Sequence, residues 1–534
     1  MTKESAGGRA AMVVGAGILL SRLVGLARGF VISAYFGAGA ESDAYTAALR
    51  IPNTLRNLLG EGAMSASFVP VYSRMLAQGE ERASRALAGA VLGLLMLLVS
   101  GLTLLGIAFA PVLTDVLADG FAPAQQELIT KLVRILFPMT AVMVLSGWCL
   151  GIQNSHRRFF WSYASAAMWS IAQIALLLGW GSRESNLVTL AEWLAWATLG
   201  GAVLQVLVQL PEVIKLVGPI RPTLQRNATG VSDVLRNVVP VMLALGVAQI
   251  SGLIDLQIAS HLSEGSTTLV SYASLVALLP VGLFGVSIAA SALPDLARDT
   301  TGRSLDGLRE RLRGGWQRIL FYIVPSAVAC IVLGDYLIGI LYRVGKFTAE
   351  DQRIGHWILA GYAVGMVSVG SVKLMSSAYY ALQDYRTPLR SSMLSVVVSA
   401  AAAAGLAFNF RESPLAAAGI ALGAALGSYV NLTLLLAGLR KRLGPLYTPA
   451  MWRGTRRIAL AALAAGAVGF GLHVLQERQW PTVHPRIVGP PILVAFGVTY
   501  LLVAWLLGSA EASRWLRLRP RAVDRPEANG RTPA

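Results

Sequence analysis

The sequence predicts an all-α protein that crosses a membrane many times. The chain of 534 residues is 55% hydrophobic and only 14% charged, which leaves too little charge to cover the surface of a soluble protein of this size. Apolar runs of about twenty residues, long enough to cross a hydrocarbon core about 30 Å thick, recur along its whole length. The expected fold class is therefore a polytopic α-helical membrane protein.

We count about fourteen transmembrane helices, and proline interrupts the second and the eighth. The first run follows Lys3 and Arg9 and is longer than a signal peptide, so we expect a retained first helix. The runs lie at residues 10–36, 44–72, 86–110, 131–152, 158–180, 187–210, 232–260, 267–294, 315–340, 354–380, 389–409, 414–438, 455–475 and 488–508.

The positive charge is distributed as a signal of membrane topology. A net charge of +17 could indicate nucleic-acid binding, but no binding motif accompanies it and we expect no nucleic-acid partner. If both termini are cytoplasmic, most of the 45 Lys and Arg residues fall in inward-facing stretches. This alternation follows the positive-inside rule and predicts cytoplasmic N and C termini.

A short pattern, S-x-x-P-x-x-x-R, occurs at the same end of the second and eighth runs. Its residues are Ser67, Pro70 and Arg74 in one copy, and Ser291, Pro294 and Arg298 in the other. A pattern this short also arises by chance. Because six spans separate the copies, it indicates a parallel pseudo-repeat of two six-helix lobes, as in alternating-access transporters.

The repeat and the loop composition together predict five parts of the chain. They are an N-lobe (1–210), a cytoplasmic linker (211–231), a C-lobe (232–440), two C-terminal helices (441–508) and a basic cytoplasmic tail (509–534).

Four arginines lie in or beside the first two spans: Arg22, Arg28, Arg50 and Arg56. A central arginine costs about 2.5 to 3.5 kcal/mol in a lipid-facing helix, so four would cost on the order of 10 kcal/mol. A water-filled cavity that binds an anion removes most of that cost. The planar guanidinium donates two parallel hydrogen bonds, which suits a phosphate or diphosphate. Alternatively, Arg28 reaches the outer surface, and Arg50 pairs with Asp43 or Glu61.

The segment between these spans predicts a turn and a bend. Gly37 and Gly39 are expected to form the turn, and Ser42 or Asp43 is a natural N-cap of the next helix. Pro52, with Gly60 and Gly62, should break the second helix and provide a hinge.

At these residues the chain resembles the MurJ/MviN family of lipid II flippases, in the multidrug/oligosaccharidyl-lipid/polysaccharide exporter superfamily. The resemblance rests mainly on the first two spans, and similar helix spacing continues over nearly the whole chain. The matching stretches are "SRLVGLAR" (21–28), "FGAGAESDAY" (36–45), "RIPNTLRNLLGEGAMSASFVPVY" (50–72), "YRVGKFT" (342–348) and "ALQDYRTP" (381–388).

The resemblance implies two lobes around a cationic cavity, with helices 13 and 14 forming a groove for the lipid tail. It implies a monomeric transporter in the bacterial inner membrane that needs no cofactor. Its expected partners are lipid II or a related polyprenyl-diphosphate lipid, and the membrane lipids around it. Membrane potential, and in some members sodium, helps drive transport. The family's substrate-binding residues fall on Ser21, Arg22, Arg28, Asp43 and Arg56, and we add Arg50 to this set.

Two features depart from the family pattern. Leu275 and Leu278 stand where helix 8 of the family commonly has an arginine and a glutamate, so the C-lobe lacks a cation. Asp255 resembles a sodium ligand of some members, but helix 11 offers Ser399 and alanines instead of the usual Asn and Asp. The alternative is that Asp255 is a buried carboxylate paired with another helix, for which Lys373 is a candidate.

Other functions fit the sequence less well. A flippase for another polyprenyl-linked glycan needs the same arginines, whereas an ion-coupled exporter needs carboxylates in the cavity. The five histidines are scattered, Cys149 and Cys330 form no C-x-x-C pair, and no hydrolase or P-loop motif occurs, so we expect neither an enzyme nor a metal site. A scaffold that does not transport is a further alternative.

Overall fold

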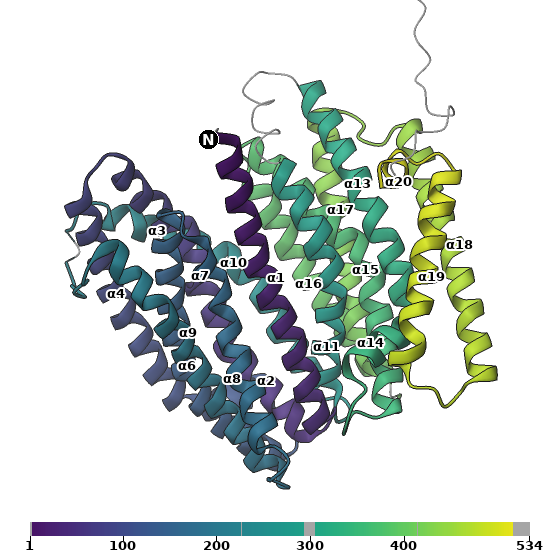
Figure 1. Cartoon of the computed structure of the whole chain (residues 1–534), viewed down its shortest axis with the longest axis horizontal. Helices are drawn as coiled ribbons and strands as arrows, with labels where there is room; N and C mark the ends of the chain where they lie inside the picture. Colours follow the sequence, from purple (N-terminus) through teal and green to yellow (C-terminus); the bar gives the residue numbers. More distant parts are fainter. Residues whose placement is uncertain (1–2, 226, 293–304, 414, 516–534) are drawn as a thin grey trace, which may run out of the picture. The chain divides into compact units, whose positions relative to one another are not determined.

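The structure, a computed structural model, describes residues 3–225, 227–292, 305–413 and 415–515. It is 86% helical, and the described residues contain no strand. The helices are α1 (Lys3–Phe36), α2 (Ala40–Leu59), α3 (Glu61–Ala77), α4 (Glu81–Ala108), α5 (Ala110–Leu117), α6 (Pro123–Ser155), α7 (Phe159–Ala164), α8 (Ala166–Trp180), α9 (Leu187–Val217), α10 (Val231–Ser260), α11 (Ser266–Pro280), a π-helical turn (Val281–Val286), α13 (Leu305–Val332), α14 (Gly334–Tyr342), α15 (Ala349–Ala381), α16 (Arg386–Asn409), α17 (Ala416–Leu443), α18 (Pro449–Gln479), α19 (Pro485–Leu506) and α20 (Ala510–Trp515) (Figure 1).

The predicted class of a polytopic helical membrane protein is confirmed. Within the described residues, twelve helices are long and apolar enough to cross a membrane, and they correspond in order to the third to fourteenth predicted runs. The first two runs are helical as well, as α1 and as α2 with α3. They are outside this set of twelve, so the count of fourteen is not confirmed.

The second predicted run is broken at Gly60, as its glycines indicate, whereas Pro52 lies inside the first part without ending it. Helix α2 contains Pro52 and ends at Leu59, and Gly60 adopts a non-helical conformation before α3 begins. The predicted N-cap is wrong, because α2 starts at Ala40 after Gly39, with Ser42 and Asp43 inside the helix. A distant carboxylate takes over this role: Oε1 of Glu264 accepts a hydrogen bond from Ala40 N at 2.8 Å, where a negative charge is favourable.

By contacts, the chain divides into two compact units. One comprises Met1–Thr268 with Val344–Asp351, and the other comprises Leu269–Arg343 with Gln352–Ala534. In the first unit α6 is central and packs against α2, α3, α4 and α9, while α1 packs on α7 and α8 (Figure 1). This unit also takes in α10, which packs on α2 and α3. These units are defined by contacts within the structure, whereas the predicted lobes are defined by the internal repeat. The predicted lobe boundaries therefore stay predictions.

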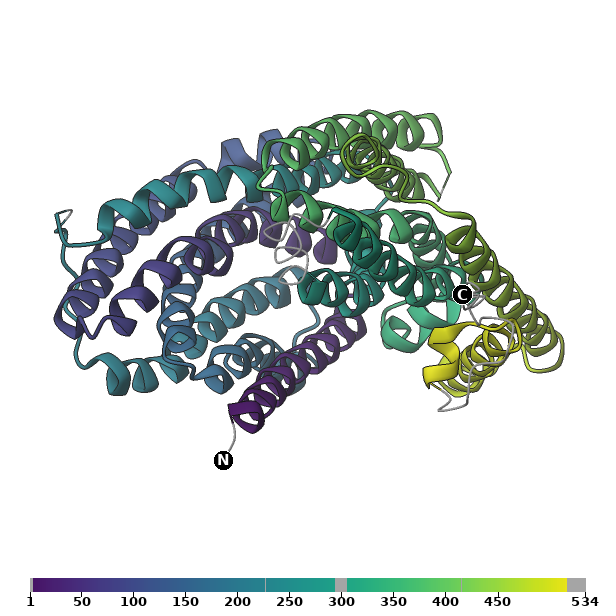
Figure 2. The same cartoon turned by 90° about the horizontal axis from the view of Figure 1, so that it is seen from above.

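The second unit shows how small residues bring helices together. Helices α16 and α17 run side by side (Figure 2). A Cβ at Gly423 would lie 2.4 Å from the backbone nitrogen of Ala403, and one at Gly427 would lie 2.6 Å from the carbonyl oxygen of Ser395. Such close backbone approach is typical of helix pairs in membranes. At the C-terminal end, α18 packs against both α13 and α19.

The residues of the predicted internal repeat are only partly among those that the structure describes. Ser67 Oγ donates to the carbonyl of Ala63 at 2.6 Å, and Ser291 Oγ donates to that of Ile288 at 3.0 Å. Pro294 and Arg298 lie outside the described residues, as does most of the predicted basic tail. The repeat therefore stays a prediction.

The "ALQDYRTP" stretch forms the turn between α15 and α16 around Asp384. Its Oδ1 accepts hydrogen bonds from the backbone nitrogens of Arg386 and Thr387 at 3.1 and 3.0 Å, and its Oδ2 accepts from Thr387 Oγ1 at 2.7 Å. Arg442, in the last turn of α17, donates to Oδ2 at 2.6 Å. The Thr387 hydrogen bonds, with help from the Arg442 charge, lower the pKa of Asp384 to about 2.

This turn gives a prediction about acid stability. A lowered pKa in the folded state means that the ionised carboxylate stabilises the fold above its ordinary pKa of about 4, and that this contribution is lost as pH falls toward 2. Asp384→Asn should therefore lower the unfolding temperature at pH 7, and its difference from wild type should shrink between pH 4 and pH 2. Thermal unfolding of the detergent-solubilised chain measures this difference. A difference that is unchanged across this range contradicts the assignment.

Candidate functional site

Two of the predicted arginines come together on one aromatic ring. The guanidinium of Arg28, on α1, lies 4.5 Å from the ring centroid of Trp169, and that of Arg56, on α2, lies 5.8 Å from it. Trp169 belongs to α8. We call Arg28, Arg56 and Trp169 the arginine–tryptophan cluster. Three helices from different parts of the first unit therefore meet at this point.

The position of Trp169 follows from the packing of α8. A Cβ at Gly201, on α9, would lie 2.9 Å from the carbonyl oxygen of Trp169, so glycine lets α9 approach the α8 backbone. The Trp169 side chain packs against the small buried group of Met139, Met143 and Ala202. Its indole Nε1 is buried and donates no hydrogen bond within the described residues. The ring is thus fixed from behind, while the two guanidinium groups lie near it.

The electrostatics of the cluster favour an anion. A guanidinium over an indole ring gains about 0.5 to 2 kcal/mol, more when water is excluded. That attraction lowers the cost of placing two positive charges near one ring inside an apolar unit. The positive charge of Arg28 also interacts electrostatically with the Tyr45 side chain. The Tyr45 hydroxyl shares a hydrogen bond with Thr198 Oγ1 at 2.8 Å and donates one to Gln173 Oε1 at 3.3 Å. The guanidinium groups of Arg28 and Arg56 together present the hydrogen-bond donors that a phosphate requires.

Arg50 is oriented differently and faces α10. A Cβ at Gly252 would lie 2.2 Å from the Arg50 guanidinium. The positive charge of Arg50 also interacts electrostatically with the carboxyl group of Asp255, one turn further along α10. The alternative pairing of Arg50 with Asp43 is not present. Asn57 Nδ2 also donates to Gln249 Oε1 at 3.2 Å, so α2 and α10 have two polar connections.

This geometry bears on the predicted sodium site at Asp255. A nearby guanidinium opposes the binding of a cation. Among the described residues, no group of three or more His, Cys, Asp or Glu side chains is placed to hold a metal ion. Sodium binding at Asp255 stays a prediction.

Arg22 and Ser21 lie apart from the cluster. Arg22 is exposed and Ser21 is half-buried. The separation of Arg22 from Arg28 by six residues turns α1 by about 600°, so the two side chains point about 120° apart. Within the described residues, no carboxylate lies within 4.0 Å of Arg22. The structure therefore brings Arg28 and Arg56 together and leaves Arg22 on an open face of α1.

Asp43 holds the start of α11 against α2. Its side chain is 1% exposed. Oδ2 accepts a hydrogen bond from Gly265 N at 2.7 Å, and Oδ1 accepts from Thr268 N at 2.8 Å and from Thr268 Oγ1 at 2.7 Å. Ser42 and Thr268 add a hydroxyl pair at 3.0 Å. We call Ser42, Asp43, Gly265 and Thr268 the outer latch, because the predicted topology with cytoplasmic termini puts this end of α2 at the outer face.

The "YRVGKFT" stretch packs against the same turn. Lys346 N donates to the carbonyl of Ala34, near the end of α1, at 3.0 Å. Gly37 has a φ of +62°, and a Cβ there would lie 2.7 Å from the Lys346 carbonyl oxygen. The left-handed conformation and the lack of space both require glycine. The "YRVGKFT" stretch thus packs against the turn between α1 and α2, beside the outer latch.

Sequence reasoning missed Trp169. A tryptophan inside an apolar run is usually a packing residue or an interface anchor, so it gave no signal by itself. Leu275 and Leu278, at the positions that depart from the family pattern, are 40% and 55% exposed on α11. These positions therefore present leucine to the surface of the second unit.

Comparison with known proteins agrees with the resemblance. Residues 32–488 match the family model described as lipid II flippase MurJ. The chain is 30% identical to the lipid II flippase MurJ of Burkholderia cenocepacia, over 94% of this chain and 97% of that protein. It is 29% identical to the probable lipid II flippase MurJ of Vibrio cholerae, over 94% of this chain and 96% of that one.

Solved structures show the same fold. A lipid II flippase MurJ in an inward closed conformation matches with a TM-score of 0.76 and 23% identity, over 95% of this chain and 100% of that chain. An inward-facing multidrug transporter of the MATE family matches with a TM-score of 0.66 and 17% identity, over 82% of this chain and 98% of that chain. Given the match of the family model to most of its length, the chain belongs to the lipid II flippase MurJ family.

Proposed function

We propose that this protein is a flippase that moves lipid II from the inner to the outer leaflet of the bacterial cytoplasmic membrane by alternating access. Membership of the MurJ family supports this function. The structural observation that carries it is the convergence of Arg28 and Arg56 on Trp169, because two guanidinium groups match the two phosphates of a diphosphate.

In this mechanism each group has a physical role and no covalent bond changes. Arg28 and Arg56 bind the diphosphate and replace part of its hydration shell, which lowers the barrier to entering an apolar region. Trp169 holds both guanidinium groups in place. Arg22, on the open face of α1, is a first contact for the approaching headgroup. The outer latch at Asp43 keeps the outer end closed until the headgroup is bound, while the lipid tail stays in the membrane.

The setting of this activity is part of the proposal. The chain works as a monomer with both termini in the cytoplasm, consistent with the distribution of its Lys and Arg residues. Membrane potential supplies a driving force, since moving one elementary charge across 100 mV is worth about 2.3 kcal/mol. Its product serves cell-wall synthesis on the outer surface.

Transport of reconstituted lipid II tests this function. Proteoliposomes that hold labelled lipid II in the inner leaflet should expose it to an impermeant reagent much faster than liposomes without protein. The mass of the transported lipid II should be unchanged, because a flippase, unlike an enzyme, does not alter its substrate covalently. Equal rates with and without protein contradict the proposal. A polyprenyl diphosphate with another glycan, transported faster than lipid II, would point to the alternative glycan flippase.

A further inference from the structure

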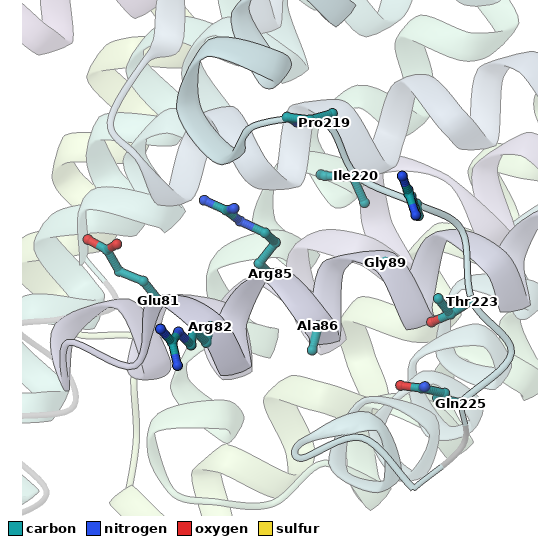
Figure 3. Close-up of a pocket in the computed structure, with 10 residues that line it drawn as sticks. Glu81, Arg82, Arg85, Ala86, Gly89, Pro219, Ile220, Thr223 and Gln225 are labelled. Atoms are coloured by element: carbon teal, nitrogen blue, oxygen red, sulfur yellow. The ribbon is translucent and has the colours of Figure 1, made fainter.

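A second basic site, made of other residues than the arginine–tryptophan cluster, lies at the start of α4 in the first unit. It is a pocket of about 530 Å³ between the first turns of α4 and the segment 219–225 that follows α9 (Figure 3). Three arginines line it, Arg82, Arg85 and Arg221, together with one carboxylate, Glu81. The formal charge of these four side chains is +2. Nothing in the flippase mechanism uses this pocket.

The wall of the pocket is fixed by close backbone packing. Thr223 N donates a hydrogen bond to the carbonyl of Gly89, on α4, at 3.1 Å. A Cβ at Gly89 would lie 2.7 Å from the carbonyl oxygen of Arg221, and one at Gly93 would lie 2.2 Å from that of Thr223. Two glycines of α4 therefore let the segment lie directly on the helix. This contact fixes the backbone that carries Arg221 relative to α4.

The arginines of the pocket are available to a ligand. Arg85 reaches from α4 toward the stretch that bears Pro219 and Ile220 (Figure 3). Its guanidinium would lie 3.6 Å from a Cβ at Gly218, which caps the end of α9 with a φ of +79°. Within the described residues, no carboxylate lies within 4.0 Å of the guanidinium groups of Arg82, Arg85 or Arg221. The positive charge of the pocket thus has no ion pair among these residues.

The surface of α4 beyond the pocket indicates a lipid. Met96, Leu97 and Leu104 are 41%, 58% and 69% exposed. At 100° per residue they lie within about 60° of Arg82 around the helix axis, and Met96 and Leu97 lie about 20 Å further along it. An acyl chain is about as long as this separation, so a lipid with its phosphate in the pocket would reach Met96 and Leu97 with the ends of its acyl chains.

We propose that this pocket binds the phosphate of an anionic phospholipid headgroup, whose acyl chains reach the exposed Met96 and Leu97. The shared chemistry is a phosphate group, which a free phosphate ion also offers. The exposed Met96 and Leu97 favour the lipid, because they add a second contact that a free ion cannot make. This proposal does not depend on which lipid the protein transports.

Native mass spectrometry of the full-length protein with phosphatidylglycerol tests the proposal. Each arginine near the membrane surface should strengthen binding about five-fold, so Arg85→Gln with Arg221→Gln should weaken it about 25-fold. Arg74→Gln is the matched control, because Arg74 is an exposed arginine at the end of neighbouring α3 and does not line the pocket. Replacing both pocket arginines with lysine should keep most of the binding.

The other arms of the experiment separate the sources of phosphate. Zwitterionic phosphatidylcholine, whose choline group offsets the charge of its phosphate, should bind the wild type more weakly than phosphatidylglycerol does and should lose less affinity in the glutamine variant. Inorganic phosphate at the same concentration should not displace phosphatidylglycerol. Displacement by inorganic phosphate overturns the lipid assignment. Equal retention of phosphatidylglycerol by the wild type, the glutamine variant and Arg74→Gln overturns the site. The unfolding temperature of each variant is measured alongside. If the glutamine variant unfolds at the wild-type temperature, its lower affinity supports the site. If it unfolds at a lower temperature, the lysine variant decides instead: retained binding of phosphatidylglycerol supports the site, and lost binding overturns it.

Discussion

Arg28→Ala and Arg56→Ala should each remove most of the transport activity while the protein remains in the membrane. A hydrogen bond to a charged group contributes about 1.5 to 3 kcal/mol, so losing one guanidinium should slow transport about 10- to 100-fold. The double replacement should leave no measurable transport. Complementation of a bacterial strain depleted of its own lipid II flippase measures this effect, with protein levels determined in parallel.

Two control variants make this prediction specific. Arg28→Lys keeps the charge but loses the planar fork, so it should complement partially. Arg183→Ala removes another arginine that lies near a tryptophan, 5.9 Å from the ring centroid of Trp180, at the end of α8 and away from the cluster. It should complement fully. Full complementation by both Arg28→Ala and Arg56→Ala contradicts the assigned role.

Asp43→Ala should open the outer latch. The replacement leaves the backbone nitrogens of buried Gly265 and Thr268 without their acceptor, and an unsatisfied buried group costs about 1 to 3 kcal/mol. The start of α11 should then separate from α2 more often. The transport cycle should lose its closed outer end, and complementation should fall about as far as for Arg28→Ala.

Cysteine labelling measures this opening directly. Ser266, in the first turn of α11, is 3% exposed, so Ser266→Cys in a background without Cys149 and Cys330 should react slowly with an impermeant maleimide. Asp43→Ala should speed this reaction about tenfold or more. Glu41→Gln, which removes an acid from the same turn of α2 but from outside the latch, should not. Equal labelling rates in all three proteins would show that Asp43 does not control this opening.

The sequence predicts the helices well because hydropathy depends on local composition alone. Twelve apolar runs form helices with bounds within about ten residues of the predicted ones. The second run is the instructive exception. Arg50, Arg56 and Asp43 lower the hydropathy of α2, so two residues with a role in the proposed function, Arg56 and Asp43, also help to remove the helix from the apolar set. Functional sites are where such local rules are expected to fail.

What could not be predicted depends on contacts between distant segments. Asp43 was expected to cap its own helix or to line the cavity mouth, but its hydrogen bonds go to residues 265–268. Arg50 acts on Asp255, about two hundred positions away in the chain. The role of Trp169 becomes evident only from its contacts with Arg28 and Arg56, which lie on other helices. No periodicity or motif in a single sequence encodes these pairings.

The central claim is that Arg28 and Arg56 together recognise a diphosphate. The most direct measurement is the binding of lipid II and of a polyprenyl monophosphate to the wild-type protein and to the Arg28→Ala/Arg56→Ala variant. The wild type should prefer the diphosphate lipid by about tenfold or more, and the variant should bind both lipids weakly without preference. A variant that retains both the affinity for lipid II and the preference for the diphosphate contradicts the claim.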